Sequence, residues 1–427
     1  MSFLVYDLVF LALFLIFSSM FLYKRRDNLK REGLLFLYKT SWGINLINKI
    51  GKRYKKTLSV LSYVSIAMGY ILMIGIIYLV YTILKVYIIS PDIVRMIKVP
   101  PILPLFPYIP QAFNLDFLPP FYFTYWIIII AVIAISHEMF HGIFAAKNKV
   151  KIKTTGFGFF PFFLPIFLAA FVELDEKRME KKSRFSQMAI LSAGTFANVL
   201  TAILFFIILL GFFALAFSPA GVIFDNYATS VIPVAGISAV NGINLSNASY
   251  DKVLELTNEE SLSEVKAGGE LYLVNKKILE NQKTNSELII VYNSAPAIKE
   301  NLSNIILEIN GIKIDSLNKL VEQLEKYSPG EEITIKTKTA ERFEEKTIRL
   351  EEHPARENAS WLGISFSSQQ TNSAIGKIIT SVSSFKQPGI YYEPKFDGIS
   401  LFVYHLLWWI ILISLSVALM NMLPVGI

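Results

Sequence analysis

The sequence contains no cysteine and only four histidines among its 427 residues. The absence of cysteine excludes disulfide bonds, thiolate ligands for zinc and cysteine nucleophiles. A metal site in this chain must therefore use nitrogen and oxygen ligands. Because histidine is so rare here, two histidines placed close together in the sequence are informative.

Charged residues are also scarce, at 18% of the chain, whereas hydrophobic residues make up 53% and the mean hydropathy is +0.47. This composition is too apolar for a soluble protein of this length and indicates a protein largely embedded in a lipid bilayer. The net charge of +7 comes with basic residues concentrated between residues 24 and 56, beside the first apolar segments. Lipid headgroups and membrane topology explain this charge better than nucleic acid does, so no nucleic-acid partner is expected.

Five apolar runs are long enough to cross a membrane as helices. They cover about residues 3–23, 58–89, 121–146, 185–217 and 399–419. The excess of Lys and Arg in residues 24–56 predicts a cytoplasmic loop, which sets the direction of every later span. Residues 91–120 are rich in proline and predict an outer loop. Residues 156–172 are apolar but interrupted by Gly and Pro, which favours a re-entrant hairpin.

Residues 218–398 have a different character, because charged and Asn/Ser-rich stretches alternate there with short strand-like runs. A strand, an Asn-Gly turn and a second strand are predicted twice, at 239–245 and 308–314. A helical pattern follows each copy, at 250–256 and 317–324. Residues 333–337, 346–350 and 361–366 alternate as half-buried strands do. We therefore expect two copies of one α+β unit on the outer face, at about 218–290 and 291–368.

The expected fold is a polytopic α-helical membrane protein of about five spans plus re-entrant segments, with an inserted extracytoplasmic α+β region. Residues 1–120 hold the N-terminal membrane spans, the basic loop and the Pro-rich loop. Residues 121–217 form the membrane core around the third span, the hairpin and the fourth span. The α+β region follows at 218–398, and residues 399–427 form the last span.

Two of the four histidines belong to a His-Glu-x-x-His motif at residues 137–141, at the end of the third apolar run. On a helix, residues four apart project from the same face, so His137 and His141 can bind one Zn²⁺ while Glu138 reaches a water on the metal. The alternative is a pair of hydrogen-bonding histidines beside a neutral Glu. Two imidazoles and a carboxyl in an apolar helix are costly unless something compensates them, and a metal ion is the commonest compensation.

The order of the motifs resembles the site-2 protease family, the zinc intramembrane metalloproteases. The resemblance covers most of the chain from about Tyr125: His-Glu-x-x-His, then Ala-Gly-Thr-Phe-Ala-Asn at 193–198, then the α+β region, then Asn421-x-x-Pro424. The run Ser-Ala-Pro-Ala at 294–297 and the strand after it are similar to a PDZ domain. The resemblance implies peptide-bond hydrolysis within transmembrane segments, with Zn²⁺ as cofactor and Glu138 as general base.

The family's last motif is Asn-x-x-Pro-x-x-x-x-Asp-Gly, and its Asp is the third zinc ligand. Counting on from Asn421 places this Asp beyond Ile427, where the sequence ends. The resemblance therefore implies that the chain as given lacks the third ligand, binds zinc weakly and has little or no activity. We expect truncation to explain this better than a loss of activity in the whole protein.

Asn198 and Asn421 are candidates for binding the substrate or the developing oxyanion, because a side-chain amide can donate a hydrogen bond in a water-poor site. The alternative for both residues is packing between membrane helices, which small and polar residues promote without any catalytic duty. The family often has Pro where this chain has Thr195. This departure weakens the detailed match of that helix but leaves the zinc chemistry untouched.

The favoured function is a zinc-dependent intramembrane endopeptidase that cleaves single-span substrates near the cytoplasmic side, as in regulated intramembrane proteolysis. The expected partners are transmembrane substrates, contacted through the hairpin at about 157–171, the lipid bilayer, and peptide termini captured by the PDZ-like units. Two alternatives are a membrane metalloprotease with a Glu as third ligand, such as a prenyl-protein protease, and a pseudoprotease. The pseudoprotease would bind the termini of membrane proteins without cleaving them.

Overall fold

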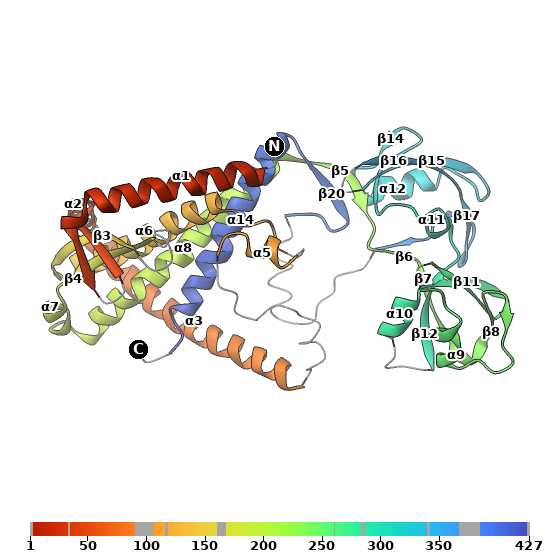
Figure 1. Cartoon of the computed structure of the whole chain (residues 1–427), viewed down its shortest axis with the longest axis horizontal. Coiled ribbons are helices and arrows are strands. Elements are labelled where there is room, and N and C mark those ends of the chain that lie inside the picture. The colour runs from red at the N-terminus through yellow and green to blue at the C-terminus, as the bar shows by residue number, and fades with distance from the viewer. Residues whose placement is uncertain are drawn as a thin grey trace. The chain divides into compact units, whose positions relative to one another are not determined.

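The computed structural model describes residues 3–32, 35–89, 106–115, 118–159, 168–259, 261–282, 287–339, 342–366 and 385–424. The chain divides into two compact units, whose elements are labelled in Figure 1. The first, called the helical unit, contains Met1–Leu215 and Phe396–Ile427. The second, called the β-rich unit, contains Ala216–Lys395.

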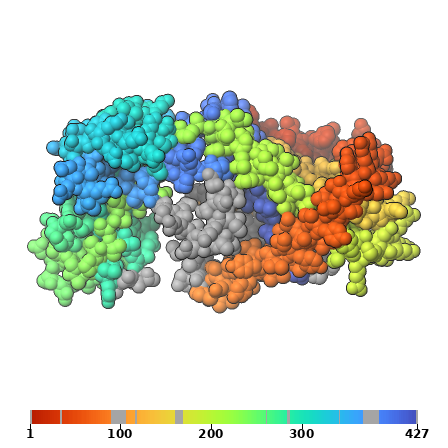
Figure 2. Space-filling model, turned by 180° about the vertical axis from the view of Figure 1, so that it is seen from behind, coloured from red at the N-terminus to blue at the C-terminus, as the bar shows by residue number. Residues whose placement is uncertain are grey.

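Five helices in the described residues are long and apolar enough to cross a membrane, which confirms the expected number of spans. They are α1 (Phe3–Lys24), α3 (Lys55–Ile89), α6 (Phe123–Lys147), α8 (Arg184–Ala216) and α14 (Asp397–Met420). A helix satisfies its backbone groups internally, which a segment surrounded by lipid requires. Apolar side chains are exposed along α3, and Val60, Tyr63 and Ile74 are among them. This helix is the orange segment in Figure 2. These features are those of a multi-pass membrane protein.

Residues 24–56, expected to form a basic loop, are instead largely structured. They contain the short 3-10 helix η1 (Arg26–Asn28), strands β1 (Leu29–Glu32) and β2 (Leu35–Thr40), and helix α2 (Ile44–Arg53). β2 pairs with β3 (Ile152–Phe159), and β3 pairs with β4 (Leu168–Leu174). The four strands form one antiparallel sheet in the order β1-β2-β3-β4. Charge alone did not predict this sheet, because the partner of β2 comes much later in the chain.

The segment expected to form a re-entrant hairpin corresponds to β3 and β4, although residues 160–167 between them lie outside the described residues. Gly156 has a packing role here, since a Cβ at this position would lie 2.1 Å from the carbonyl oxygen of Tyr38. The insertion of this hairpin into a membrane stays a prediction. Helix α7 (Glu176–Glu180) connects β4 to α8. Of the Pro-rich segment, the described part contains α5 (Ile109–Ala112), and residues 90–105 and 116–117 lie outside it.

Helix α2 packs closely against the C-terminal half of α6. A Cβ at Gly51 would lie 2.7 Å from the Cβ of Ala146 and 2.8 Å from the carbonyl oxygen of Ile143. A Cβ at Gly142 would in turn lie 2.9 Å from Cγ2 of Ile47. One glycine on each helix therefore allows the two backbones to approach, and this contact fixes the end of α6 that follows the His-Glu-x-x-His motif.

The β-rich unit contains two six-stranded sheets. The first has the order β7-β12-β11-β10-β8-β9, and the second has the order β16-β15-β13-β5-β20 with β14 paired to β13. The first sheet and its helices comprise β7 (Thr229–Pro233), β8 (Ile237–Val240), β9 (Ile243–Asn244), α9 (Tyr250–Glu255), β10 (Ser263–Ala267), β11 (Glu270–Val274), α10 (Lys276–Asn281) and β12 (Leu288–Asn293), with the 3-10 helix η3 (Val234–Gly236).

The second sheet and its helices comprise β5 (Phe217–Ile223), α11 (Pro296–Lys299), β13 (Ile305–Ile309), β14 (Ile312–Lys313), α12 (Leu317–Leu324), β15 (Glu332–Lys338), β16 (Phe343–Arg349) and β20 (Ile390–Pro394). Two short pairs complete the unit: β17 (Glu351–His353) with β18 (Arg356–Trp361), and β19 (Ile364–Ser365) with β6 (Asn226–Tyr227). Each large sheet has its own buried apolar cluster. These are the two larger cores of the unit, and a smaller buried cluster contains Leu273, Ala295 and Ile298.

Both Asn-Gly turns predicted from the sequence are confirmed. Asn241 and Gly242 have φ angles of 49° and 79°, and Asn310 and Gly311 have φ angles of 47° and 77°. Two successive positive φ angles match the twist of the strands that they connect, and Asn and Gly adopt them at low cost. The turns join β8 to β9 and β13 to β14, and helices α9 and α12 follow as expected.

Two details differ from the expected units. β5 falls in the residue range expected for the first unit, 218–290, yet it pairs with β13 and β20 of the second sheet. The first sheet is therefore inserted into the sequence of the second. The prediction of one strand at 361–366 is wrong, because Trp361 ends β18 whereas Ile364 begins β19. Gly363, with a φ of 81°, turns the chain between them.

Candidate metal centre

The two histidines of the His-Glu-x-x-His motif face each other on α6. The Nε2 atoms of His137 and His141 are 3.1 Å apart. The two rings lie edge to face with their centroids 4.7 Å apart. This arrangement follows from the helix itself, because side chains four residues apart project from one face. The pair presents two ring nitrogens to a single point.

The orientation of His141 is set by α8. Its Nδ1 atom lies 2.7 Å from the carbonyl oxygen of Ile190. A carbonyl oxygen only accepts hydrogen bonds, so Nδ1 donates the proton and Nε2 keeps a free lone pair. A backbone carbonyl that holds one ring nitrogen while the other binds metal is the usual support of a metal-binding histidine.

Gly194 of α8 makes room for both imidazoles. A Cβ at this position would lie 2.3 Å from Nε2 of His141 and 2.4 Å from Nε2 of His137. Real Cβ atoms do not approach other atoms so closely, so any larger residue would displace the rings. Glycine at position 194 therefore gives the two rings the space that this arrangement needs.

The spacing of the two nitrogens suits a zinc ion. Zinc binds histidine nitrogens at about 2.0–2.1 Å in tetrahedral geometry, which places two such ligands about 3.3 Å apart. The observed 3.1 Å between the Nε2 atoms of His137 and His141 agrees with this value. Within the residues that the structure describes, no group of three or more His, Cys, Asp or Glu side chains could hold a metal ion.

Glu138 lies beside the histidines and on the wall of a cavity of about 510 Å³. One oxygen of its carboxylate accepts a hydrogen bond of 2.9 Å from the backbone N–H of Val172 in β4. The cavity is mostly apolar and is bounded by α6, by β3 and β4, and by the connection between β2 and α2. Its large apolar side chains include Trp42, Ile47, Met139, Phe157 and Phe171. A carboxylate is thus presented to an apolar cavity next to a pair of potential metal ligands.

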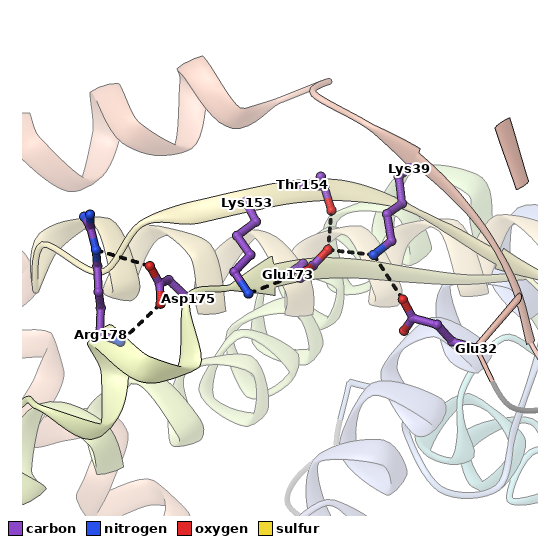
Figure 3. A network of polar contacts seen from close by, with 7 residues as sticks. All are labelled: Glu32, Lys39, Lys153, Thr154, Glu173, Asp175 and Arg178. Carbon is purple, nitrogen blue, oxygen red and sulfur yellow. Dashed lines mark hydrogen bonds and ion pairs between the residues drawn. The ribbon is translucent and has the colours of Figure 1, made fainter. Parts of the chain in front are cut away.

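The strand that holds Glu138 is itself tied to β2 and β3 by an ion-pair network (Figure 3). Glu173, next to Val172, accepts hydrogen bonds of 2.9 Å from Lys39 and 2.7 Å from Thr154. Lys39 also pairs with Glu32 at 3.0 Å. The hydrogen bond from Lys39 lowers the pKa of the Glu173 carboxyl, and the same contact raises the pKa of Lys39.

Of the two asparagine candidates, Asn198 is close to the centre. It is completely buried, and both polar atoms of its amide are without a hydrogen-bond partner. It lies one turn beyond Gly194 on the same face of α8, and one turn further on Thr201 donates a hydrogen bond of 3.3 Å to Ser136 of α6. A buried amide without partners is costly, so its position facing α6 calls for a functional explanation.

Asn421 is placed differently. It caps the C-terminus of α14, where its backbone N–H donates to the carbonyl of Val417, and the residue is exposed. Among the described contacts, none joins its side chain to the motif residues of α6.

Sequence reasoning did not identify the contribution of the N-terminal segment to this site. Thr40 at the end of β2 and the chain that follows it, as far as Ile47 in α2, line the cavity beside Glu138. Asp7 in α1 was also overlooked, although its carboxylate contacts the first residues of α6. Asp7 is an acidic residue within an apolar span. Such residues are rare unless they have a specific role, so its position in the sequence could have pointed to one.

Two imidazoles that could bind one metal ion, a carboxylate beside them and five apolar helices are the combination expected of a membrane-embedded metallohydrolase. The model of peptidase family M50 matches residues 125–427, which is most of the chain. The chain belongs to this family, the site-2 protease family of membrane metalloproteases. This membership decides against the prenyl-protein protease alternative. No curated protein matches the sequence significantly. The family match begins inside α6 and leaves out α1, α2 and α3.

Proposed function

We propose that the protein is a zinc-dependent intramembrane endopeptidase whose zinc ligands include His137 and His141 and whose general base is Glu138. The observation that carries the proposal is the pair of Nε2 atoms 3.1 Å apart against Gly194. If both nitrogens bind one cation, that cation explains why the two rings point toward the same place. A carboxylate on an adjacent wall of a cavity completes the set of groups that hydrolysis requires.

In this proposal, each residue near the centre has a separate task. Bound zinc would act as a Lewis acid and would lower the pKa of a water molecule toward neutrality. Glu138 accepts the proton of the attacking water and then delivers it to the leaving amine. The N–H of Val172 orients the Glu138 carboxylate toward the cavity wall. Ile190 keeps His141 in the tautomer that leaves Nε2 free. We propose a carboxylate as the third protein ligand, as the family motif implies.

Asn198 is proposed to donate a hydrogen bond to the substrate carbonyl or to the oxyanion that forms from it. Its amide is buried without partners and faces the helix that carries the histidines. Replacing Asn198 with Leu keeps the volume and removes the donor, so the rate should fall on the order of a hundredfold. An unchanged rate with altered thermal stability would support helix packing instead. For Asn421 the same role remains a proposal without a supporting contact.

We propose that the substrates are single-span membrane proteins whose cleavable segment is extended in the cavity beside Glu138. Three features support this: the cavity is apolar, its walls include β3 and β4, and its volume of about 510 Å³ suits several side chains. The exposed apolar residues of α1 and α3 support contact with the lipid bilayer. Cleavage near the cytoplasmic side, and an extracytoplasmic location of the β-rich unit, are parts of the proposal that rest on the distribution of basic residues.

The β-rich unit is proposed to bind peptide termini by strand addition, as PDZ-like domains do. Among the described residues, the second sheet ends in β16 on one side and β20 on the other, and it is the sheet proposed to accept the added strand. In this role the unit would select substrates whose outer domain has already been removed. A chain that uses only this unit would be the pseudoprotease considered as the alternative.

The substitution Glu138→Gln separates the enzyme from the pseudoprotease. The amide keeps the size of the side chain but cannot accept the proton of water. We expect cleavage of a co-expressed single-span reporter to be lost while capture of the reporter and zinc content remain. Glu176→Gln, at an exposed position of α7, is the matched control and should cleave normally. Equal cleavage by the two variants would rule out Glu138 as the base.

A further inference from the structure

Asp7 is a buried carboxylate in the first part of α1, between apolar residues. It is 1% exposed. Its two oxygens accept hydrogen bonds from the backbone N–H groups of Phe123, at 2.8 Å, and Thr124, at 2.9 Å. The hydroxyl groups of Thr124 and Tyr108 also donate to it. All four donors lie at the beginning of α6 or in the segment before it, so α1 supplies an anion to the N-terminus of another helix.

The start of α6 needs such a partner. The first N–H groups of a helix have no acceptor within the helix, and the residue before the helix usually provides one. At α6 that residue is Tyr122, whose side chain makes no capping hydrogen bond. In a lipid environment no water replaces the missing acceptor. Asp7 therefore caps α6 from a different helix, and its negative charge lies at the positive end of the helix dipole.

Other contacts hold the chain just before α6. The carbonyl of Phe121 accepts from the N–H of Tyr108 at 2.7 Å, and the N–H of Phe121 donates to the side chain of Gln111 at 3.3 Å. The indole of Trp409 in α14 donates to the carbonyl of Pro120 at 3.1 Å. Three segments far apart in the sequence thus meet at this point, and Asp7 bonds directly to the first residues of α6.

We propose that Asp7 is a positioning residue for the metal centre. His137 is 14 residues after Phe123 on an uninterrupted helix, about 21 Å along its axis. An axial shift of α6 at its capped end changes how His137 and His141 lie against Gly194. α1 thereby belongs to the catalytic apparatus, although it lies outside the residues that match the family. The effects on zinc affinity and cleavage rest on the proposed function, whereas the effect on helix capping does not.

The test compares Asp7→Leu with Ser18→Leu, which introduces the same side chain at another buried polar position of α1. Both variants are made in a form extended through the family's Asp-Gly motif and are reconstituted in lipid nanodiscs. In Asp7→Leu the amides of Phe123 and Thr124 should exchange hydrogen faster, zinc affinity should fall about tenfold, and kcat for a single-span reporter should fall about tenfold to a hundredfold at unchanged KM. Ser18→Leu should match the wild type in all these measurements.

A second change distinguishes positioning from general damage to α1. Tyr122 has the extended backbone of an N-cap residue, with φ of −95° and ψ of 161°. Tyr122→Asp can therefore supply a local cap, and in the Asp7→Leu background it should restore amide protection, zinc affinity and kcat together. Restored protection without restored zinc affinity would overturn the positioning role, as would unchanged amide exchange in Asp7→Leu. If the wild type of this extended form neither binds zinc nor cleaves, the proposed function fails, and amide exchange still decides whether Asp7 caps α6.

Discussion

The substitution Gly194→Ala tests the geometry of the centre with the smallest possible change. The added Cβ would lie 2.3 Å and 2.4 Å from the Nε2 atoms of His141 and His137. A comfortable contact between carbon and nitrogen is about 3.4 Å, so the imidazoles must move by about 1 Å or α8 must move away from α6. Neither nitrogen can then keep its present direction.

The expected cost has two parts. Overpacking of a buried site costs about 1–3 kcal/mol, which is partly offset because Ala favours a helix over Gly by about 1 kcal/mol. A displacement of about 1 Å in a reacting group costs on the order of a hundredfold in rate. Zinc affinity and cleavage should therefore fall far more than thermal stability does.

Gly211→Ala is the matched control. Gly211 lies on the same helix, and a Cβ there would meet nothing within 4 Å. Zinc affinity is measured by competition with a chelator, cleavage with a reconstituted single-span reporter, and stability by thermal unfolding in detergent. Gly211→Ala should equal or slightly exceed the wild type in all three. If Gly194→Ala behaves like Gly211→Ala in zinc affinity and cleavage, the two imidazoles do not form the centre described here.

Two further predictions concern the elements that support the site. Lys39 lowers the pKa of Glu173 from its ordinary value of 4.5, so their pairing stabilises the sheet above that pH and is lost as the pH falls through the lowered value. Lys39→Met should therefore move the midpoint of acid unfolding to higher pH, whereas Lys177→Met should not. Because the pair is partly exposed, the loss of stability should be below about 1 kcal/mol. Gly51→Ala should lower the free energy of unfolding by about 1–3 kcal/mol, since its Cβ would lie 2.8 Å from a backbone oxygen of α6. An unchanged thermal unfolding curve would contradict the close packing of α2 against α6.

The helices and turns were predictable because their signals are local. An uninterrupted apolar run specifies a membrane helix, and the five predicted spans correspond to five helices. The Asn-Gly pairs at 241–242 and 310–311 specify tight turns because both residues tolerate positive φ. The spacing of His137 and His141 likewise predicted two side chains on one helix face.

Long-range pairings were not predictable from one sequence. β2 and β3 lie far apart in the chain, and nothing in the local pattern of residues 35–40 indicates that they pair with residues 155–159. The same reason hid the bond between Asp7 and the start of α6, and the role of Gly194, which depends on a distance between two helices. The strand predicted at 361–366 failed because alternation of apolar residues continues across Gly363 while the backbone turns.

The central claim is that His137 and His141 bind one zinc ion beside Glu138. Zinc X-ray absorption spectroscopy of the purified full chain measures the number of imidazole ligands and their distances directly. The account predicts two imidazole nitrogens at about 2.0–2.1 Å, further ligands that are oxygen, and the loss of one imidazole in His141→Ala. A zinc ion without imidazole ligands, or a spectrum unchanged by His141→Ala, would contradict it.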